Sequence, residues 1–196
     1  MKSACVIIFC AFLTPSAFPL PGDADRDTTL PRPTVTAHRS QGPISIDGIL
    51  DEPGWNQVPI SNFTQKNPTE GAPPTFTSEV WVLYDDEAIY IGAKLHDASP
   101  DSIVNRIGRR DASISSDWFS VGIDSYHDRR TGFFFAVNAG GSITDGTLFN
   151  DEWDDDSWDG VWEASARIGD DGWFAEMKIP YSQLRFTKLE SYVWGI

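Results

Sequence analysis

The segment FNDEWDDDSWDGVW, residues 149–162, places three tryptophans among six acidic residues. Carboxylates suit a hard cation such as calcium, and tryptophan faces stack on the apolar faces of ligand rings. Three interpretations follow: a calcium loop, a sugar contact, or an acidic turn that folds over the end of the core. The third needs no ligand, because the rings are buried and the acids remain in water.

The calcium hypothesis rests on four aspartates that are close together in the sequence and could each supply an oxygen ligand: Asp151, Asp154, Asp156 and Asp159. Calcium takes several oxygen ligands, and carboxylates are the strongest of them in proteins. The spacing differs from an EF-hand loop, since it lacks that loop's glycine and its closing glutamate. The segment therefore predicts a structural calcium ion only as one of its alternatives.

The sugar hypothesis assigns the contact to Trp153 and Asn150, because acids flank this tryptophan on both sides in a segment without apolar period. Trp158 either closes the edge of the core or faces the ligand. Trp162 precedes the alternating residues of a strand and is predicted to be buried.

Other chemistry is weakly indicated. No G-x-S-x-G motif and no glycine-rich phosphate loop follows a predicted strand. The histidines are far apart and lack metal-ligand spacing; they are His38, His96 and His127. Many carboxylates are present, but no pair is marked as the two acids of a glycosidase. We expect no catalysis by this chain.

The elements that position these residues are predicted to be strands. Apolar residues alternate in short runs bounded by Gly, Asp and Asn, over residues 76–84, 88–97, 117–124, 132–139, 141–149, 161–168 and 172–179. This pattern predicts an all-β antiparallel sandwich, jelly-roll-like, with minor helical turns, one of them after Ile179. Glu176 falls within the last run and is predicted to be half-buried and paired with Arg185 or Lys178.

The N-terminal residues 1–24 are predicted to be a signal peptide, cleaved after Ala17 or Ala24. Their apolar run is too short to span a bilayer. Residues 25–43, rich in Pro, Asp, Thr and Arg, are predicted to be a linker, and the folded part to be 44–196. Both cysteines lie in the signal peptide, so we expect an exported chain without disulfides, in the periplasm, in the outer membrane or outside the cell.

The net charge is −14, which disfavours nucleic acid and bare anionic membranes as partners. The basic residues form two small clusters, one of Arg106, Arg109 and Arg110 and one of Arg129 and Arg130. We expect these arginines to pair with nearby aspartates.

From ISIDGILDEPGW, residues 44–55, the chain resembles family 9 carbohydrate-binding modules. The blocks SEVWVLYDDEAIYIGAKLHD, SDWFSVGIDSYHDRRTGFFFAVNAGG and DGWFAEMKIPYSQLRF, then VWGI, follow in the family's order. The likeness is greatest to the module at the N-terminus of bacterial envelope proteins whose remainder resembles an outer-membrane β-barrel. It implies a β-sandwich, often stabilised by calcium, that holds a sugar between two tryptophans.

The family's sugar-holding residues are only partly present. The resemblance places the first stacking tryptophan at Ile114, a glutamate at Ser120 and an arginine at Ala136. Asp117 and Asn138 remain, and the resemblance assigns them to sugar binding. The second stacking tryptophan would follow VWGI; we expect the polypeptide to continue and the domain to be truncated at this edge.

The sequence thus predicts a non-catalytic domain that captures or positions a carbohydrate at the cell envelope, within a larger polypeptide that also contains an outer-membrane barrel. One alternative is an interaction domain with the same fold that has lost sugar binding. Another is an accessory domain of a glycoside hydrolase. A haem-binding relative is a further alternative, although Met177 has no evident axial partner.

Overall fold

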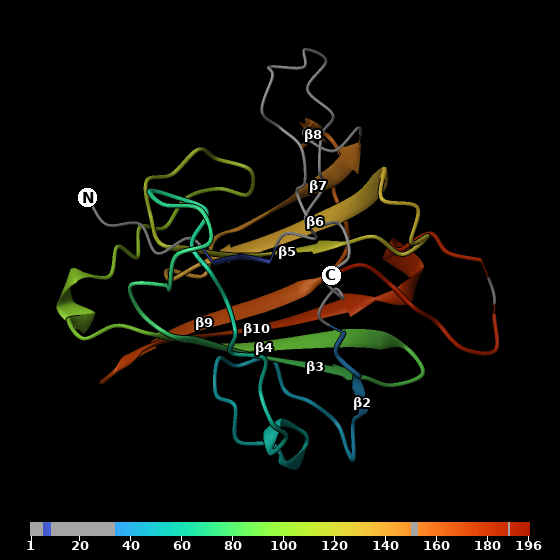
Figure 1. Cartoon of the computed structure of the whole chain (residues 1–196), viewed down its shortest axis with the longest axis horizontal. Helices are drawn as coiled ribbons and strands as arrows, with labels where there is room; N and C mark the ends of the chain where they lie inside the picture. Colours follow the sequence, from blue (N-terminus) through green and yellow to red (C-terminus); the bar gives the residue numbers. More distant parts are fainter. Residues whose placement is uncertain (1–5, 9–33, 150–152, 188) are drawn as a thin grey trace, which may run out of the picture.

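The computed structural model describes residues 6–8, 34–149, 153–187 and 189–196. Two five-stranded sheets face each other, as Figure 1 shows. The helical parts among these residues are three short 3-10 turns: η1 (Pro53–Trp55), η2 (Pro100–Ser102) and η3 (Tyr181–Gln183). The predicted all-β sandwich is confirmed.

The first sheet, at the top of Figure 1, has the order β1 (Val6–Ile8), β5 (Trp118–Ile123), β6 (Thr131–Asn138), β7 (Ile143–Phe149) and β8 (Trp153–Asp155). The second sheet has the order β2 (His38–Arg39), β3 (Ser78–Tyr84), β4 (Ala88–His96), β10 (Gly172–Pro180) and β9 (Glu163–Gly169). β1 pairs with β5 and β2 with β3 in parallel, and the other pairs are antiparallel.

The main core lies between the two sheets. Successive side chains of a strand point to opposite faces, so alternating apolar residues form one buried face. This holds for the alternating apolar residues of β4 and β5, all of which are buried: Ile89, Ile91, Ala93, Leu95, Phe119, Val121 and Ile123. The long strands therefore follow the apolar alternation in the sequence.

A second, smaller cluster covers the outer face of the second sheet. Its buried members are Trp55, Leu83, Ala88 and Tyr90. Segment 44–55 packs closely here: a Cβ atom on Gly92 of β4 would lie 3.0 Å from the Trp55 ring. A side chain at this position would push the segment away from the sheet.

Three short strands were not predicted. β2 lies in the expected linker 25–43, where Ser40 N–H donates to the Tyr84 carbonyl at 2.8 Å. β1 lies in the expected signal peptide, and β8 lies in the acidic segment. Strands of two or three residues are too short to show an alternating pattern. Within the described residues, no helix has the length and apolar character needed to cross a membrane.

Candidate functional site

The described part of the acidic tryptophan segment folds over the edge of the sandwich. Trp158 packs on Phe133 and Phe135, with ring centroids 5.0 Å and 6.1 Å apart. Trp162 is buried and lies 5.2 Å from the Phe135 ring. The predicted burial of Trp162 is confirmed, and Trp158 closes the edge of the core.

Three of the predicted ligand residues are not placed in detail. Asn150 and Asp151 lie outside the described residues. Trp153 is described as the first residue of β8, opposite Phe149 of β7. The sugar contact predicted for Asn150 and Trp153 therefore stays a prediction.

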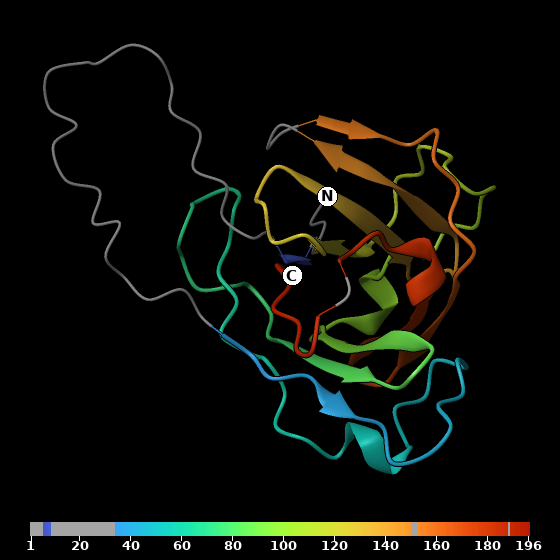
Figure 2. The ribbon, with the colours of Figure 1, turned by 90° about the vertical axis from the view of Figure 1, so that its right-hand side faces the viewer.

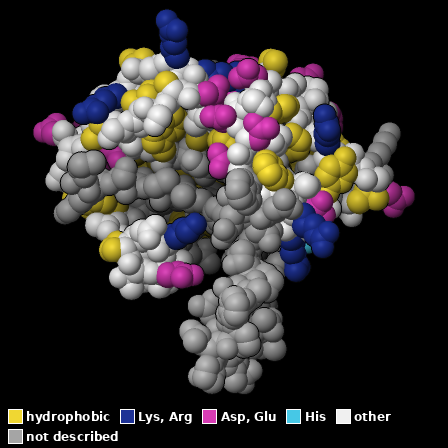
Figure 3. All heavy atoms as spheres, turned by 90° about the horizontal axis from the view of Figure 1, so that it is seen from above, with side chains coloured by type: hydrophobic (Ala, Val, Ile, Leu, Met, Phe, Trp, Pro, Cys, Tyr) yellow, Lys and Arg dark blue, Asp and Glu magenta, His cyan; other side chains and the backbone are white. Residues whose placement is uncertain are grey.

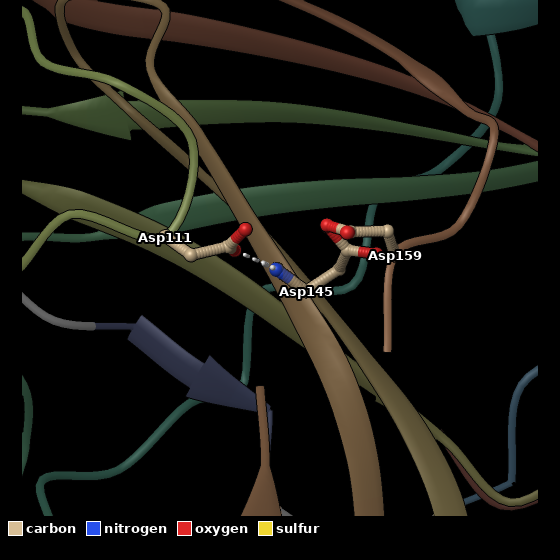
Figure 4. A group of neighbouring side chains, drawn as sticks. All are labelled: Asp111, Asp145 and Asp159. Atoms are coloured by element: carbon tan, nitrogen blue, oxygen red, sulfur yellow. Dashed lines mark hydrogen bonds between the residues drawn. The ribbon is translucent and has the colours of Figure 1, made fainter. Parts of the chain in front are cut away.

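Asp159 belongs to a different group of acids from the one expected. Figure 4 shows it beside Asp145 of β7 and Asp111. One carboxylate oxygen from each of the three residues lies within 4.8 Å of the others. Asp145 is fully buried, and its backbone N–H donates to Asp111 Oδ1 at 3.3 Å. Three segments that lie 14 to 48 residues apart in the sequence thus meet at this point.

The Arg110 guanidinium binds this group. Its Nη2 donates to Asp145 Oδ1 and, at 2.8 Å, to the Gly160 carbonyl. Its Nε lies 3.1 Å from Asp159 Oδ1 and 3.6 Å from Asp111 Oδ2. The second oxygen of Asp145 accepts from Gly160 N–H at 2.7 Å. Both oxygens of the buried carboxylate are therefore already engaged.

These contacts bear on the calcium prediction. A calcium ion takes about six to eight oxygen ligands, whereas here a guanidinium supplies the positive charge. Asp154 and Asp156 are exposed, and neither joins the Asp159 group among the described residues. The Arg110 group as it stands does not fit calcium. An ion bound through Asp151, Asp154 and Asp156 stays a prediction.

Asp117 and Asn138 are both buried and have internal hydrogen-bond partners. Asp117 Oδ2 accepts from Val104 N–H at 2.8 Å. Asn138 Nδ2 donates to the Arg106 carbonyl at 2.7 Å, and its Oδ1 accepts from Ser142 N–H at 2.8 Å. These bonds hold the 104–108 loop and the β6–β7 turn. Such burial argues against the sugar contacts predicted for the two residues.

The positions where the resemblance expects sugar ligands lie on the outer face of the first sheet. Ser120 is directly opposite Ala136 on the neighbouring strand. The Ile114 carbonyl accepts from Trp118 Nε1 at 3.2 Å, which places it beside the same face. Figure 3 shows this side of the molecule, with hydrophobic side chains in several separate groups. The three positions carry no charged group and no aromatic ring here.

A different concave surface lies along the edge of β3. One end of this edge is covered by Ile60, which forms two backbone hydrogen bonds with Val80, and the other end pairs with β2. Between them lies a groove of about 380 Å³, here called the β3 groove. Its lining includes Trp81 with the polar residues Thr34, Thr36, His38, Gln57, Ser61 and Asn62.

The β3 groove combines apolar and polar groups. Trp81 is half-buried, and its Nε1 donates to the Gln57 carbonyl at 2.9 Å, which fixes the ring. Val58, 93% exposed, belongs to the lining as well. The sequence did not predict this groove, because its walls are segments 34–38 and 57–62, which have no apolar period. Trp81 was predicted only as a strand residue, and no local motif marks Asn62 as a ligand.

Glu176 on β10 is fully buried, and its partners differ from the prediction. Its Oε2 accepts from the backbone N–H groups of Asp47 and Gly48, at 3.0 Å and 2.7 Å. Its Oε1 has no hydrogen-bond partner among the described residues. Burial raises the pKa of Glu176 to about 7. The predicted pairing with Arg185 or Lys178 is wrong, since the backbone of segment 44–55 binds the carboxylate.

Comparison with known proteins supports the fold. Neither the family models nor the curated proteins matched this chain. Among solved structures, one similar chain is a Bacteroides uniformis protein to which carbohydrate binding has been provisionally assigned. It is 14% identical, with a TM-score of 0.56, over 82% of this chain and 79% of that one. At this identity the likeness shows the fold alone.

Two further similar structures are of a family 9 carbohydrate-binding module from Caldicellulosiruptor kristjanssonii. The complex with cellotriose is 20% identical, with a TM-score of 0.49, over 74% of this chain and 66% of that one. The complex with glucose is 19% identical, also with a TM-score of 0.49, over 80% and 70%. The match thus spans just under two thirds of the first of these chains.

Proposed function

We propose that this chain is a non-catalytic carbohydrate-binding domain of an exported envelope protein, and that the β3 groove holds a sugar unit. The observation that supports this is the chemistry of the groove. A pyranose has apolar faces and a rim of hydroxyls, so it suits an indole ring surrounded by amide and hydroxyl side chains. The groove volume of about 380 Å³ falls within the usual range for ligand sites, about 300–1,000 Å³.

The wider role is proposed from the sequence. A signal peptide at residues 1–24 would deliver the domain to the periplasm, outer membrane or exterior. There it would capture or position a glycan for a larger polypeptide that would also contain an outer-membrane barrel. A structural calcium ion bound by the acidic segment stays an alternative for that segment, and the effect of a chelator on the melting temperature tests it.

A second candidate is an interaction domain that keeps the sandwich and has lost sugar binding. The residues at the expected sugar-binding positions favour this candidate. The resemblance expects a tryptophan, a glutamate and an arginine, and the chain has Ile114, Ser120 and Ala136. This candidate predicts that a correctly folded chain does not respond to neutral sugars.

A tryptophan-fluorescence titration with mono- and oligosaccharides tests the proposal. We expect a saturable change, and we expect Asn62→Ala to weaken binding by roughly three- to tenfold, the effect of one lost hydrogen bond. Asn56→Ala is the matched control, because Asn56 is exposed nearby but does not line the groove. A flat titration of the folded protein would support the interaction domain. If Asn62→Ala and Asn56→Ala bind the sugar equally well and Trp153→Ala binds it more weakly, the sugar site lies at the acidic segment instead.

A further inference from the structure

One end of the sandwich combines two segments that are distant in the sequence. The β5–β6 connection lies beside residues 184–187 and 189–196 at the right of Figure 1, and this end faces the viewer in Figure 2. Asp124 and Gly195 exchange two backbone hydrogen bonds of 3.0 Å. Ser125 Oγ also donates to the Arg185 carbonyl at 2.6 Å. The two segments therefore form one continuous surface.

This surface, here called the basic end, carries three exposed cationic side chains, Arg129, Arg130 and Arg185, together with the exposed imidazole of His127. The charge of Arg130 acts on the nearby Asp128, as expected, but neither Arg129 nor Arg130 forms the expected ion pair with a described aspartate. In the part of the chain that the structure describes, no ion pair involves either arginine or Arg185.

The neighbouring acids bind backbone groups instead. Asp124 is buried, and its two oxygens accept from the N–H groups of Asp128 and Arg129, at 3.2 Å and 2.8 Å. Asp128 Oδ1 accepts from the N–H groups of Arg130 and Thr131, both at 2.8 Å. Burial acts to raise the pKa of Asp128, but these hydrogen bonds, a further one from the Thr131 hydroxyl and the charge of Arg130 hold it below its usual value. The carboxylates thus shape the loop through its backbone, and no described carboxylate forms an ion pair with the guanidinium groups.

The loop has a defined backbone conformation. His127 and Arg129 adopt φ angles of 54° and 60°, a left-handed conformation that costs energy for residues other than glycine. The hydrogen bonds of Asp124 and Asp128 stabilise it. A ligand that binds the arginines therefore does not have to order the backbone first, which lowers the entropic cost of binding.

Aromatic rings accompany the cations. Tyr126 is 52% exposed, and Tyr192 is 45% exposed. Phe186, Tyr192 and Trp194 pack on one another, with ring centroids 5.2–5.9 Å apart. Figure 3 has the same end at its right, where Lys and Arg side chains lie beside hydrophobic ones. Rings stack on sugar faces, and guanidinium groups bind carboxylate or sulfate through paired hydrogen bonds.

We propose that the basic end binds an acidic polysaccharide, with its carboxylate or sulfate groups held by Arg129, Arg130 and Arg185. A polysaccharide is a thin chain that can contact this end alone. An anionic membrane or a broad acidic protein face would also meet the surrounding acids, and the net charge of −14 would repel it. The site uses different residues from the β3 groove, so it extends the proposed function without depending on that groove.

Native gels that contain polygalacturonate, its methyl ester or dextran sulfate test this proposal on the full chain. We expect retardation by polygalacturonate or dextran sulfate that weakens with added salt, and none by the uncharged ester. The two polyanions distinguish carboxylate from sulfate. The double variant Arg129→Gln/Arg130→Gln should bind about tenfold more weakly.

Arg106→Gln/Arg109→Gln is the matched control, because these arginines are exposed near the opposite end of β5 and their loss changes the net charge equally. It should bind as the wild type does. If the first double variant melts at a lower temperature than the wild type, Arg185→Gln replaces it. The proposal is overturned if neither polyanion retards the wild type, or if both double variants lose affinity equally. It is also overturned if the protein binds phosphatidylglycerol vesicles and neither polyanion. Neutral-sugar titration of Arg129→Gln/Arg130→Gln should be unchanged, which separates this site from the β3 groove.

Discussion

Glu176→Gln should change how stability depends on pH. The glutamate is fully buried against the Asp47–Gly48 backbone, and one of its carboxylate oxygens has no hydrogen-bond partner in the described part of the chain. Glutamine has nearly the same shape as protonated glutamate and cannot ionise. Its carbonyl oxygen can accept the same two N–H groups. The variant therefore removes the titration while it retains most of the packing.

The expected magnitude follows from the pKa. Burial raises the pKa of Glu176 from 4.5 to about 7. One unit of pKa corresponds to about 1.4 kcal/mol, so ionising this residue costs the folded state about 3 kcal/mol more than the unfolded chain. Because the folded-state pKa is the higher one, the unfolded chain loses its proton first. The stabilisation is complete below pH 4.5 and is lost as the pH rises through 7.

Urea unfolding at about pH 4.5 and about pH 8 measures this difference. We expect the unfolding free energy of the wild type to fall by about 3 kcal/mol more than that of Glu176→Gln across this interval. Glu163→Gln is the control, because it makes the same change at an exposed position of β9 and should keep the wild-type dependence. Parallel pH profiles for wild type and Glu176→Gln would refute the reasoning, since the buried carboxylate would then titrate as it does in the unfolded chain.

Two further predictions concern the Arg110 group. Arg110→Met leaves the buried Asp145 carboxylate without its cation and should lower the unfolding free energy at neutral pH by about 3 kcal/mol, measured by urea unfolding; a loss below about 1 kcal/mol would show that the pair contributes little. Because a guanidinium supplies the positive charge here, a chelator should leave the wild-type melting temperature unchanged. A lower melting temperature that added calcium restores would instead support an ion bound by the acidic segment.

The sequence predicted the long strands well because their burial is regular. Phe119 and Val121 alternate with Ser120 and Gly122, and only the first pair enters the core. A period of two, together with Gly and Asp at the ends of each run, is enough to place such strands. The short strands depend on tertiary pairing. β2 forms because segment 38–40 lies beside the end of β3. A strand of two residues carries no sequence pattern that would predict this pairing.

The candidate sites were harder to predict because their residues come together only in the fold. Arg110 meets Asp145 and Gly160, which lie 35 and 50 residues further along the chain. Glu176 binds the backbone at Asp47, 129 residues earlier. The predicted partners of this glutamate were basic side chains within ten residues of it in the sequence, Lys178 and Arg185. A backbone N–H group carries no side-chain signature, so the true partner had no pattern to be recognised by.

The same geometry explains how this fold can persist while its binding residues change. Phe119 and Phe135 face the core, where a change of volume costs stability. Ser120 and Ala136 lie on the opposite face of the same strands, so replacing a ligand there leaves the core packing intact. Binding on a sandwich can therefore move to its edges and ends, where loops are free to vary. The β3 groove and the basic end are such places, and because they share no residue, the Asn62 and Arg129/Arg130 variants test them independently.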